Sequence, residues 1–295
     1  MGARGVSEAP LAELHDVHKE LAGRAALAGA SLVVRRGDVV ALLGPNGAGK
    51  TTAIRILLGL RRADAGVVRL GGRDPTEAEA RRSVGWTPQE TDLPDTLRVG
   101  ELVDFVRLHY PGAAPRRAVL ERFELERMER RQAGGLSGGE RRRVAVALAF
   151  AGNPELVVLD EPGSGLDRSS RDALWLAIRR SASAGRGILL ATHDLREAEA
   201  LATRVVLLER GRTALDGMVA DIRRRLGGTI VRIPHQRLPR LAHADSIESR
   251  NGTLVLRTHS PDQLVRELVR LGADLRALQV VPVSLEHALA GEEPA

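Results

Sequence analysis

The stretch Gly44-Pro45-Asn46-Gly47-Ala48-Gly49-Lys50-Thr51-Thr52 decides the fold of this 295-residue chain. It fits the pattern of a phosphate-binding loop, in which two glycines enclose four residues and the second is followed by Lys and then Thr. The apolar run 39–43 before it has the composition of a strand, and the pattern over 50–60 after it is helical. This strand–loop–helix context is the one that the motif requires, so we predict that the whole stretch binds a nucleotide.

Glycine and lysine have distinct uses in this loop. Gly47 and Gly49 let the backbone turn tightly, so that successive N–H groups converge on phosphate oxygens. The helix that begins near Lys50 directs the positive end of its dipole at the same phosphates. We expect the Lys50 ammonium to bridge the β and γ phosphates and the Thr51 hydroxyl to bind Mg²⁺. The chain otherwise uses arginine, with Lys19 as the only other lysine, which favours a chemical role for Lys50.

Other apolar runs of strand length alternate with helical patterns along the chain. Runs that are apolar throughout indicate a parallel sheet covered on both faces, and the alternation with helices indicates an α/β fold. We therefore predict a P-loop NTPase (RecA-like) core. Its strands are expected at 39–43, 156–159, 188–191 and 205–208, and its helices at 50–60, 140–151, 169–184 and 195–202.

Three departures from this pattern predict further parts of the molecule. The short apolar segment 67–70 precedes two glycines and indicates a smaller antiparallel β subdomain. Residues 93–133 are rich in Glu, Arg and Leu, which predicts a helical subdomain inserted over about 93–150. After about Asp221 come alternating segments at 229–233 and 253–258 and a helical pattern at 262–271, which predict a small C-terminal α+β appendage. We thus predict a main domain over 1–220 and an accessory domain over 221–295.

Composition excludes several classes of protein. The chain has no cysteine, so disulfides and cysteine-ligated metals are excluded. The net charge is +6, but arginines are interspersed with acids rather than clustered, so we expect no nucleic-acid partner. The N-terminus lacks an apolar signal core, and no apolar run approaches the roughly 18–20 residues that cross a bilayer. We expect a cytoplasmic protein unless a partner holds it at a membrane.

A buried strand at 156–159 ends in two carboxylates. Asp160 at the strand tip can hold magnesium through water, and Glu161 can polarise an attacking water as a general base. A strand that ends in two solvated acids is common, so this pattern gains its weight from the phosphate loop.

Several short motifs together resemble those of ABC ATPases. The segment Leu136-Ser137-Gly138-Gly139-Glu140, directly before an amphipathic helical pattern, is similar to their LSGGQ signature, with Glu140 in place of Gln. Gln89 resembles the Q-loop residue, Asp167 in Ser164-Gly165-Leu166-Asp167 the D-loop residue, and His193 the switch histidine. With the phosphate loop and the acidic strand, these motifs follow the family order over residues 11–215.

The resemblance implies a mechanism. ABC ATPases act as head-to-tail dimers, in which ATP bound by one subunit is capped by the signature of the other, here Ser137, Gly138, Gly139 and Glu140. It implies that Gln89 senses the γ-phosphate and Mg²⁺, that His193 contacts the γ-phosphate and the attacking water, and that Asp167 acts across the dimer interface. It also implies a homodimer, or a heterodimer with a second ATPase subunit, bound to a transmembrane permease at the inner face of the membrane.

The platform for adenine departs from the family. ABC ATPases usually stack adenine on an aromatic side chain upstream of the phosphate loop, and residues 1–85 contain no Phe, Tyr or Trp. Alignment places Leu21 at that position, where it could pack against adenine. His15 or His18 could stack on the base instead.

The C-terminal end carries a second, shorter resemblance. Residues 281–289 read VPVSLEHAL and are similar to the "P-x-S-L-E-D-x-F" ending of ATPases from bacterial ABC-2 type exporters of drugs, antibiotics and polysaccharides. This resemblance favours an exporter.

Two other functions remain open. A soluble ABC ATPase could act on ribosomes or DNA, but ribosomal members usually carry two cassettes and DNA-repair members a long coiled coil. A regulatory module without turnover is the third possibility. The presence of Lys50, Asp160, Glu161 and His193 argues against it.

Overall fold

The computed structural model describes residues 9–90, 92–222, 228–250 and 252–282. The chain divides into two compact units between Asp216 and Gly217, and the domain boundary predicted at 220/221 stays a prediction. Among the described residues, no helix is both long and apolar enough to cross a membrane. The exporter-like ending over 281–289 lies outside the described residues from position 283 onward.

The first unit is organised around a six-stranded sheet with the order β5-β6-β7-β3-β8-β9. Neighbouring strands from β5 to β8 are parallel, as the prediction of an α/β fold requires. The predicted strands and helices of this core are all present, with ends that differ by a few residues. The strands are β3 (Val39–Leu43), β5 (Val84–Thr87), β6 (Leu156–Asp160), β7 (Gly187–Ala191), β8 (Arg204–Glu209) and β9 (Arg212–Met218).

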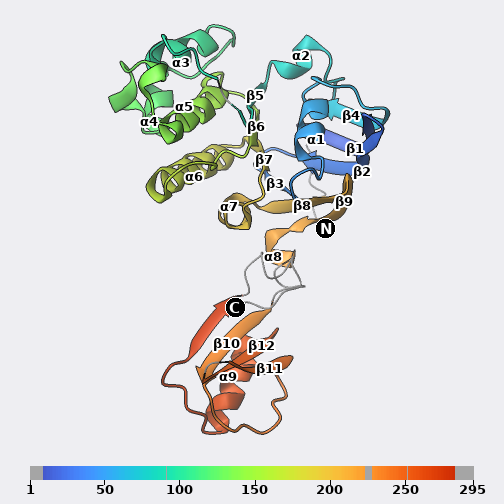
Figure 1. The fold of residues 1–295 in the computed structure, drawn as a ribbon, viewed down its shortest axis with the longest axis vertical. Helices are drawn as coiled ribbons and strands as arrows, with labels where there is room; N and C mark the ends of the chain where they lie inside the picture. Colours follow the sequence, from blue (N-terminus) through green and yellow to red (C-terminus); the bar gives the residue numbers. More distant parts are fainter. Residues whose placement is uncertain (1–8, 91, 223–227, 251, 283–295) are drawn as a thin grey trace, which may run out of the picture. The chain divides into compact units, whose positions relative to one another are not determined.

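Strand β6 shows why residues 156–159 are apolar at every position. Val157 and Leu159 belong to a core shared with helices, whereas Leu156 and Val158 belong to a second core on the other face of the sheet. Figure 1 shows α3, α4 and α5 on one side of this sheet and α1 with strands β1, β2 and β4 on the other. Because side chains alternate between faces, a strand covered on both sides needs a continuous apolar run.

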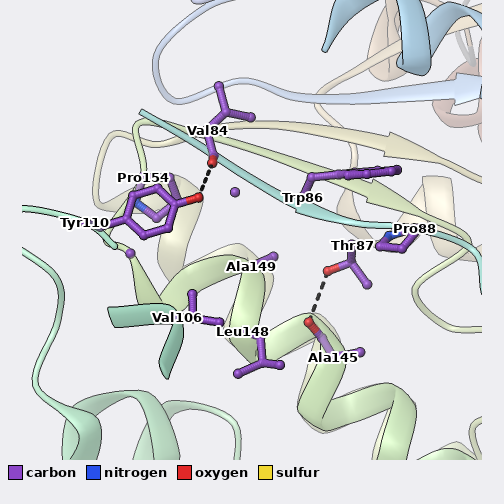
Figure 2. Close-up of a pocket in the computed structure, with 12 residues that line it drawn as sticks. Val84, Trp86, Thr87, Pro88, Val106, Tyr110, Ala145, Leu148, Ala149 and Pro154 are labelled. Carbon is purple, nitrogen blue, oxygen red and sulfur yellow. Dashed lines mark hydrogen bonds between the residues drawn. The ribbon is translucent and has the colours of Figure 1, made fainter. Parts of the chain in front are cut away.

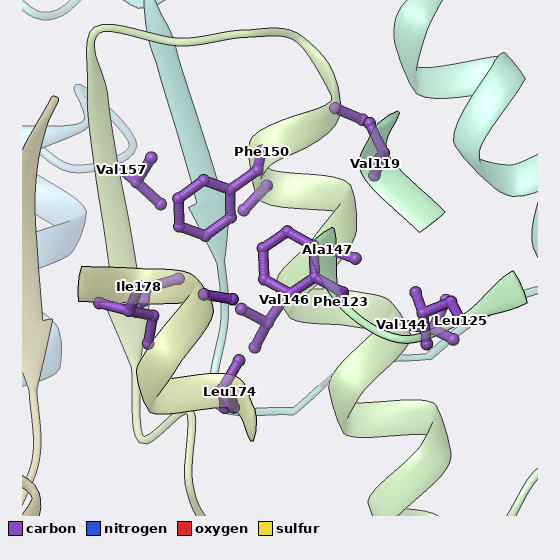
Figure 3. Close-up of a cluster of buried hydrophobic side chains, with 14 of the residues drawn as sticks. Val119, Phe123, Leu125, Val144, Val146, Ala147, Phe150, Val157, Leu174 and Ile178 are labelled. Carbon is purple, nitrogen blue, oxygen red and sulfur yellow. The ribbon is translucent and has the colours of Figure 1, made fainter. Parts of the chain in front are cut away.

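Helices form the core on one face of the sheet. The rings of Phe123 and Phe150 lie 5.1 Å apart between their centroids and pack beside Val157 and Ile178 (Figure 3). This arrangement joins the predicted helical subdomain to the sheet through one continuous core. The helices of the unit are α1 (Lys50–Leu57), α2 (Ala78–Arg81), α3 (Val99–Arg107), α4 (Arg116–Arg122), α5 (Gly138–Ala151), α6 (Arg168–Ser183) and α7 (Leu195–Leu201), with 3₁₀ turns at Glu126–Met128 and Ala133–Gly135.

A three-stranded antiparallel sheet covers part of the other face. Its order is β2 (Arg24–Val34), β1 (Ala12–Leu21) and β4 (Ala65–Leu70), and the sequence predicted only β4. The register between β1 and β2 shifts at several points, which breaks the simple alternation by which such strands are recognised.

The second unit is a four-stranded antiparallel sheet packed against one helix, as predicted for an α+β appendage. Leu264 and Leu268 of the helix are buried against Val231 and Leu256 of the sheet. The strand order is β11-β12-β10-β13. The elements after α7 and β9 are α8 (Val219–Ile222), β10 (Thr229–Pro234), β11 (Ser246–Arg250), β12 (Thr253–Thr258), α9 (Pro261–Arg270) and β13 (Gln279–Pro282).

Candidate nucleotide-binding site

Residues from distant parts of the sequence line one pocket at the carboxyl ends of the parallel strands. The phosphate loop, residues 44–52, follows β3, Asp160 is the last residue of β6, and Glu161 follows it. In open α/β sheets such crevices are the usual place for ligands. The pocket has a volume of about 320 Å³ and is lined by Ala26, Asn46, Gly47, Gly49, Lys50, Thr51, Thr52, Gln89, Asp160 and Glu161.

Two glycines let the phosphate loop lie close to its neighbours. Gly49 has φ 105°, and a Cβ there would lie 2.5 Å from the carbonyl oxygen of Ala26 and 2.7 Å from the Leu27 side chain. A Cβ on Gly44 would lie 2.4 Å from the carbonyl oxygen of Leu208. Any larger residue would therefore push the loop away from β2 and β8.

Lys50 is the first residue of α1, and its side chain is buried. Its ammonium donates hydrogen bonds to the carbonyl oxygens of Gly44 at 2.6 Å and Pro45 at 3.2 Å. The loop thus holds a positive charge beside the N-terminus of α1, where the helix dipole adds to it. This is a favourable environment for phosphate groups.

The residues predicted to hold magnesium lie together. The Thr51 hydroxyl donates to the Asp160 carboxylate at 3.1 Å, and Gln89 lines the same pocket. Asp160 is buried, and burial raises the pKa of its carboxyl group. A hydroxyl, a carboxylate and an amide are hard oxygen donors, which suits Mg²⁺. The described residues contain no group of three or more His, Cys, Asp or Glu able to hold a metal, and Mg²⁺ typically takes further ligands from substrate phosphates and water.

Glu161 and His193 form a second pair at this edge. Nδ1 of His193 lies 2.9 Å from Oε1 of Glu161, and the Glu161 N–H donates to the carbonyl oxygen of Ala191 at 2.8 Å. Glu161 has φ 52°, in the left-handed region that only glycine adopts freely. His193 is exposed and reaches the pocket through Glu161.

The segment 136–140, which we call the serine turn, starts α5. The Ser137 hydroxyl accepts from the Glu140 N–H at 3.3 Å, and the Glu140 carboxylate accepts from the Ser137 N–H at 2.8 Å. Together these bonds form a capping box. Arg131 also donates to the Glu140 carboxylate at 2.6 Å, and this bond is the main reason that the pKa of Glu140 lies below its ordinary value. Ser137, Gly138, Gly139 and Glu140 do not line the pocket of their own chain.

The remaining predicted residues lie outside the pocket. Asp167 caps α6, accepting at 2.9 Å from both the N–H and the hydroxyl of Ser170. Leu21 ends β1 and does not line the pocket, nor do His15 and His18, so the adenine platform stays a prediction.

Three residues at or beside the pocket were not predicted from the sequence. Ala26 of β2 lies against the loop at Gly49. Arg142 is buried and donates to the carbonyl oxygens of Pro88 and Gln89. The pattern of α5 alone does not reveal it, because the residues four positions after Arg141, Arg142 and Arg143 are all buried.

Glu197 is the third of these residues. It is buried on α7, and the indole N–H of Trp175 donates to its carboxylate at 3.2 Å. Burial raises the pKa of Glu197. Its carboxylate lies so close to Gly163 that a Cβ there would come within 2.5 Å of it, so it supports the turn that follows Glu161.

Sequence comparisons place the chain among known proteins. A family model described as "ABC transporter" matches residues 27–164. The chain is 34% identical to Nod factor export ATP-binding protein I of Ralstonia nicotianae, over 90% of this chain and 86% of that protein. It is 40% identical to the doxorubicin resistance ATP-binding protein DrrA of Mycobacterium tuberculosis, over 79% of this chain and 72% of the other.

Solved structures give the same result. An ATP-binding subunit of an ABC transporter is 31% identical, covers 73% of this chain and 92% of its own, and superposes with a TM-score of 0.67. A dimeric bacterial ABC transporter cassette is 25% identical, covers 70% and 98% of the two chains, and has a TM-score of 0.62.

Proposed function

This chain belongs to the ABC transporter family, as an ATP-binding and ATP-hydrolysing subunit, and from that membership we propose that it drives an exporter of the ABC-2 type. The names of two relatives, one an export protein and the other a drug-resistance protein, support this direction of transport. The cargo is selected by the permease, so this chain supplies energy rather than specificity.

One observation carries the proposal for the site: a single pocket holds the phosphate loop, Gln89 and the Asp160–Glu161 pair. The loop N–H groups and the Lys50 ammonium bind the β and γ phosphates of ATP. Thr51, Asp160 and Gln89 hold Mg²⁺. When bound there, Mg²⁺ neutralises charge that develops on the phosphates.

Glu161 is the general base in this proposal. Its carboxylate accepts a proton from the water that attacks the γ-phosphorus, and the bond from that phosphorus to the β-bridging oxygen breaks, giving ADP and phosphate. We assign the proton transfer to Oε2, because His193 already contacts Oε1 at 2.9 Å. His193 thereby orients the base and contributes a further donor beside the γ-phosphate.

The serine turn acts on the second subunit of a head-to-tail dimer. Ser137, Gly138 and Gly139 present a hydroxyl and N–H groups at the start of a 14-residue helix, which suits the γ-phosphate of ATP bound by the partner. Glu140 braces this turn from within, and Asp167 acts at the same interface. The dimeric form of a related cassette supports this arrangement, with either a second copy or a second ATPase subunit as partner.

The dimer binds a transmembrane permease at the inner face of the cell membrane and needs no nucleic acid. The helical subdomain, joined to the sheet by the core around Phe123 and Phe150, is the part that faces the permease. Residues 221–295 form an accessory domain on this subunit.

Replacement of Glu161 tests the catalytic assignment. We expect Glu161→Gln to bind ATP normally and to lower kcat by about 100-fold or more, since general-base catalysis contributes that much. ATP should also trap the variant as a stable dimer in size-exclusion chromatography. The matched control is Glu209→Gln, which changes an exposed acid at the end of the parallel strand β8 and should leave kcat unchanged. Normal hydrolysis by Glu161→Gln would exclude Glu161 as the base.

Purification of the full chain from its own membranes tests the transport assignment. A permease with several apolar helices should co-purify and stimulate the ATPase. Recovery with ribosomes or DNA and without a permease would favour the soluble ATPase alternative instead.

A further inference from the structure

Arg142 occupies an unusual place, because arginine side chains mostly lie at the protein surface. It lies in the second turn of α5, four residues after Gly138, and only 7% of it is exposed. Its neighbours Arg141 and Arg143 on the same helix are more exposed. Arg142 reaches inward, toward the carboxyl ends of the parallel strands.

The guanidinium of Arg142 bridges two strand ends. One terminal nitrogen donates to the carbonyl oxygens of Pro88 at 2.6 Å and Gln89 at 3.1 Å, just beyond β5. The other terminal nitrogen donates to the carbonyl oxygen of Asp160, at the end of β6. β5 and β6 are neighbours in the sheet, and their ladder ends at Thr87 and Leu159. Arg142 thus binds backbone carbonyls just past the end of this ladder.

A second hydrogen bond links α5 to β5. The Thr87 hydroxyl donates to the carbonyl oxygen of Ala145 at 3.2 Å, one turn along the helix from Arg142 (Figure 2). A pocket of about 280 Å³ lies beside this contact, between β5, α3 and α5. Thr87 and Arg142 therefore both link α5 to the strand that leads to Gln89.

Nearby carboxylates favour the charged form of Arg142. Burial lowers the pKa of Arg142, and the nearby carboxylates of Asp160, Glu197 and Glu161 oppose that shift. A buried cation is retained only where fixed acceptors and anions surround it. The flat fork of a guanidinium can serve several carbonyls at once, whereas the single ammonium of lysine cannot span them in the same way.

We propose that Arg142 is a positioning residue for ATP hydrolysis, which sets the Gln89 and Asp160–Glu161 backbones relative to each other and links them to the serine turn through α5. This inference rests on the roles proposed above for Gln89, Asp160 and Glu161. A displacement of the serine turn is passed along one rigid helix to the pocket of the same chain. The two nucleotide sites of a dimer are coupled by this route, because the serine turn contacts the ATP of the partner.

The test compares Arg142→Lys and Arg142→Met with matched variants of the adjacent arginine. Arg142→Lys keeps the charge, and Arg142→Met keeps most of the volume without donors. Arg141→Lys and Arg141→Met are the controls, since Arg141 also makes two hydrogen bonds, to Asp95 and to the carbonyl oxygen of Ala133. Four quantities are measured in the full chain: kcat, KM for ATP, and nucleotide Kd with Mg²⁺ and with EDTA.

We expect both Arg142 variants to lower kcat by about ten- to 100-fold, as small misplacements of catalytic groups do. Nucleotide Kd in EDTA should change by less than about threefold, because the phosphate loop is untouched. KM, which is measured with Mg²⁺, should follow the Kd with Mg²⁺. The gain in affinity from Mg²⁺ should shrink, because Asp160 and Gln89 move. Both Arg141 variants should match the parent in all four quantities.

Several results would overturn the proposal. They are parental kcat in folded Arg142→Lys, a Kd in EDTA that worsens in step with kcat, an equal effect of the Arg141 variants, or loss of folding in both Arg142 variants. Glu161→Gln, measured alongside, separates this proposal from the one on which it rests. If Glu161→Gln is inactive and Arg142→Lys is not, only the role of Arg142 fails. If Glu161→Gln is active, the assignment of the base fails first.

Discussion

The nucleotide pocket and the serine turn are two polar sites built in opposite ways. The pocket joins six residues of the phosphate loop, Gln89 and residues 160–161, which only the folded sheet brings together. The serine turn is stabilised by Arg131 and Glu140, within ten residues of each other. One site therefore depends on the tertiary fold, whereas the other is formed by its own segment and then presented to a partner.

The pKa values of an acid from each site differ in a way that matches this contrast. Burial raises the pKa of Asp160, whereas Arg131 lowers that of Glu140. In the proposed mechanism the carboxylate of Asp160 gains a cation, Mg²⁺, together with the nucleotide, whereas the carboxylate of Glu140 already has Arg131 as its cation. A site prepared for a ligand keeps an incompletely satisfied charge, and a site that serves as a rigid donor surface does not.

The largest effect should come from breaking the pocket at Lys50. Lys50→Ala removes a charged donor to phosphate, a loss of about 1.5–3 kcal/mol, or roughly ten- to 100-fold in Kd. Titration with a fluorescent nucleotide measures it. Lys19→Ala is the control, since it deletes the other lysine, whose ion pair with Asp64 lies at the surface and contributes little. Equal losses of affinity in both variants would contradict a specific role for Lys50.

A smaller effect, on stability, should follow from removing the hydrogen bonds that hold the serine turn. Glu140→Ala removes half of the capping box and the partner of Arg131, and should lower the free energy of unfolding by about 1–2 kcal/mol. Glu140→Gln, which matches the common residue of the family, should lose less, since Gln also completes the box. Denaturant unfolding at several pH values measures both.

The pH dependence of Glu140→Ala has a definite sign. The pKa of Glu140 is lowered on folding, so its contribution to stability is present above the ordinary value of 4.5 and is lost as pH falls through the folded pKa. The difference between the parent and Glu140→Ala should therefore shrink in acid. A difference that stays constant or grows in acid would show that the Arg131 contact is not its source.

The smallest effect should appear at Asp167, the other local cap. Asp167→Ala should cost about 1 kcal/mol of unfolding free energy, because Ser170 loses the acceptor for its N–H, whereas Asp167→Asn should keep most of the cap. In the monomer neither variant should change nucleotide Kd. If Asp167→Ala weakened nucleotide binding in the monomer, Asp167 would belong to the pocket of its own chain and the contrast between local and assembled sites would fail.

Most of the fold was predictable because its signals are local. The strands β3, β6, β7 and β8 are covered on both faces, so each contains an apolar run of four or five residues. β1 and β2 were missed because their paired register shifts break the alternation. The order of the strands is set by crossovers over long distances, and a linear pattern of apolar residues does not specify it.

The site was predictable to the extent that each motif specifies its own chemistry. Arg141, Arg142 and Arg143 are identical in type, and only their angle around α5 makes one of them a bridge between strand ends. Leu21 was chosen by position in an alignment, whereas the structure places Ala26 against the loop. Such residues are defined by packing, which depends on segments far away in the sequence.

The backbone at Glu161 has a consequence for how this protein can be altered. A residue with a side chain at φ 52° carries about 1–3 kcal/mol of strain that glycine would not. Selection for heat resistance alone would thus favour Glu161→Gly, and the resulting protein would be more stable but would lack the proposed base. Thermal stability and ATP hydrolysis favour different amino acids at this one position. A screen for more stable variants must therefore also select for ATP hydrolysis.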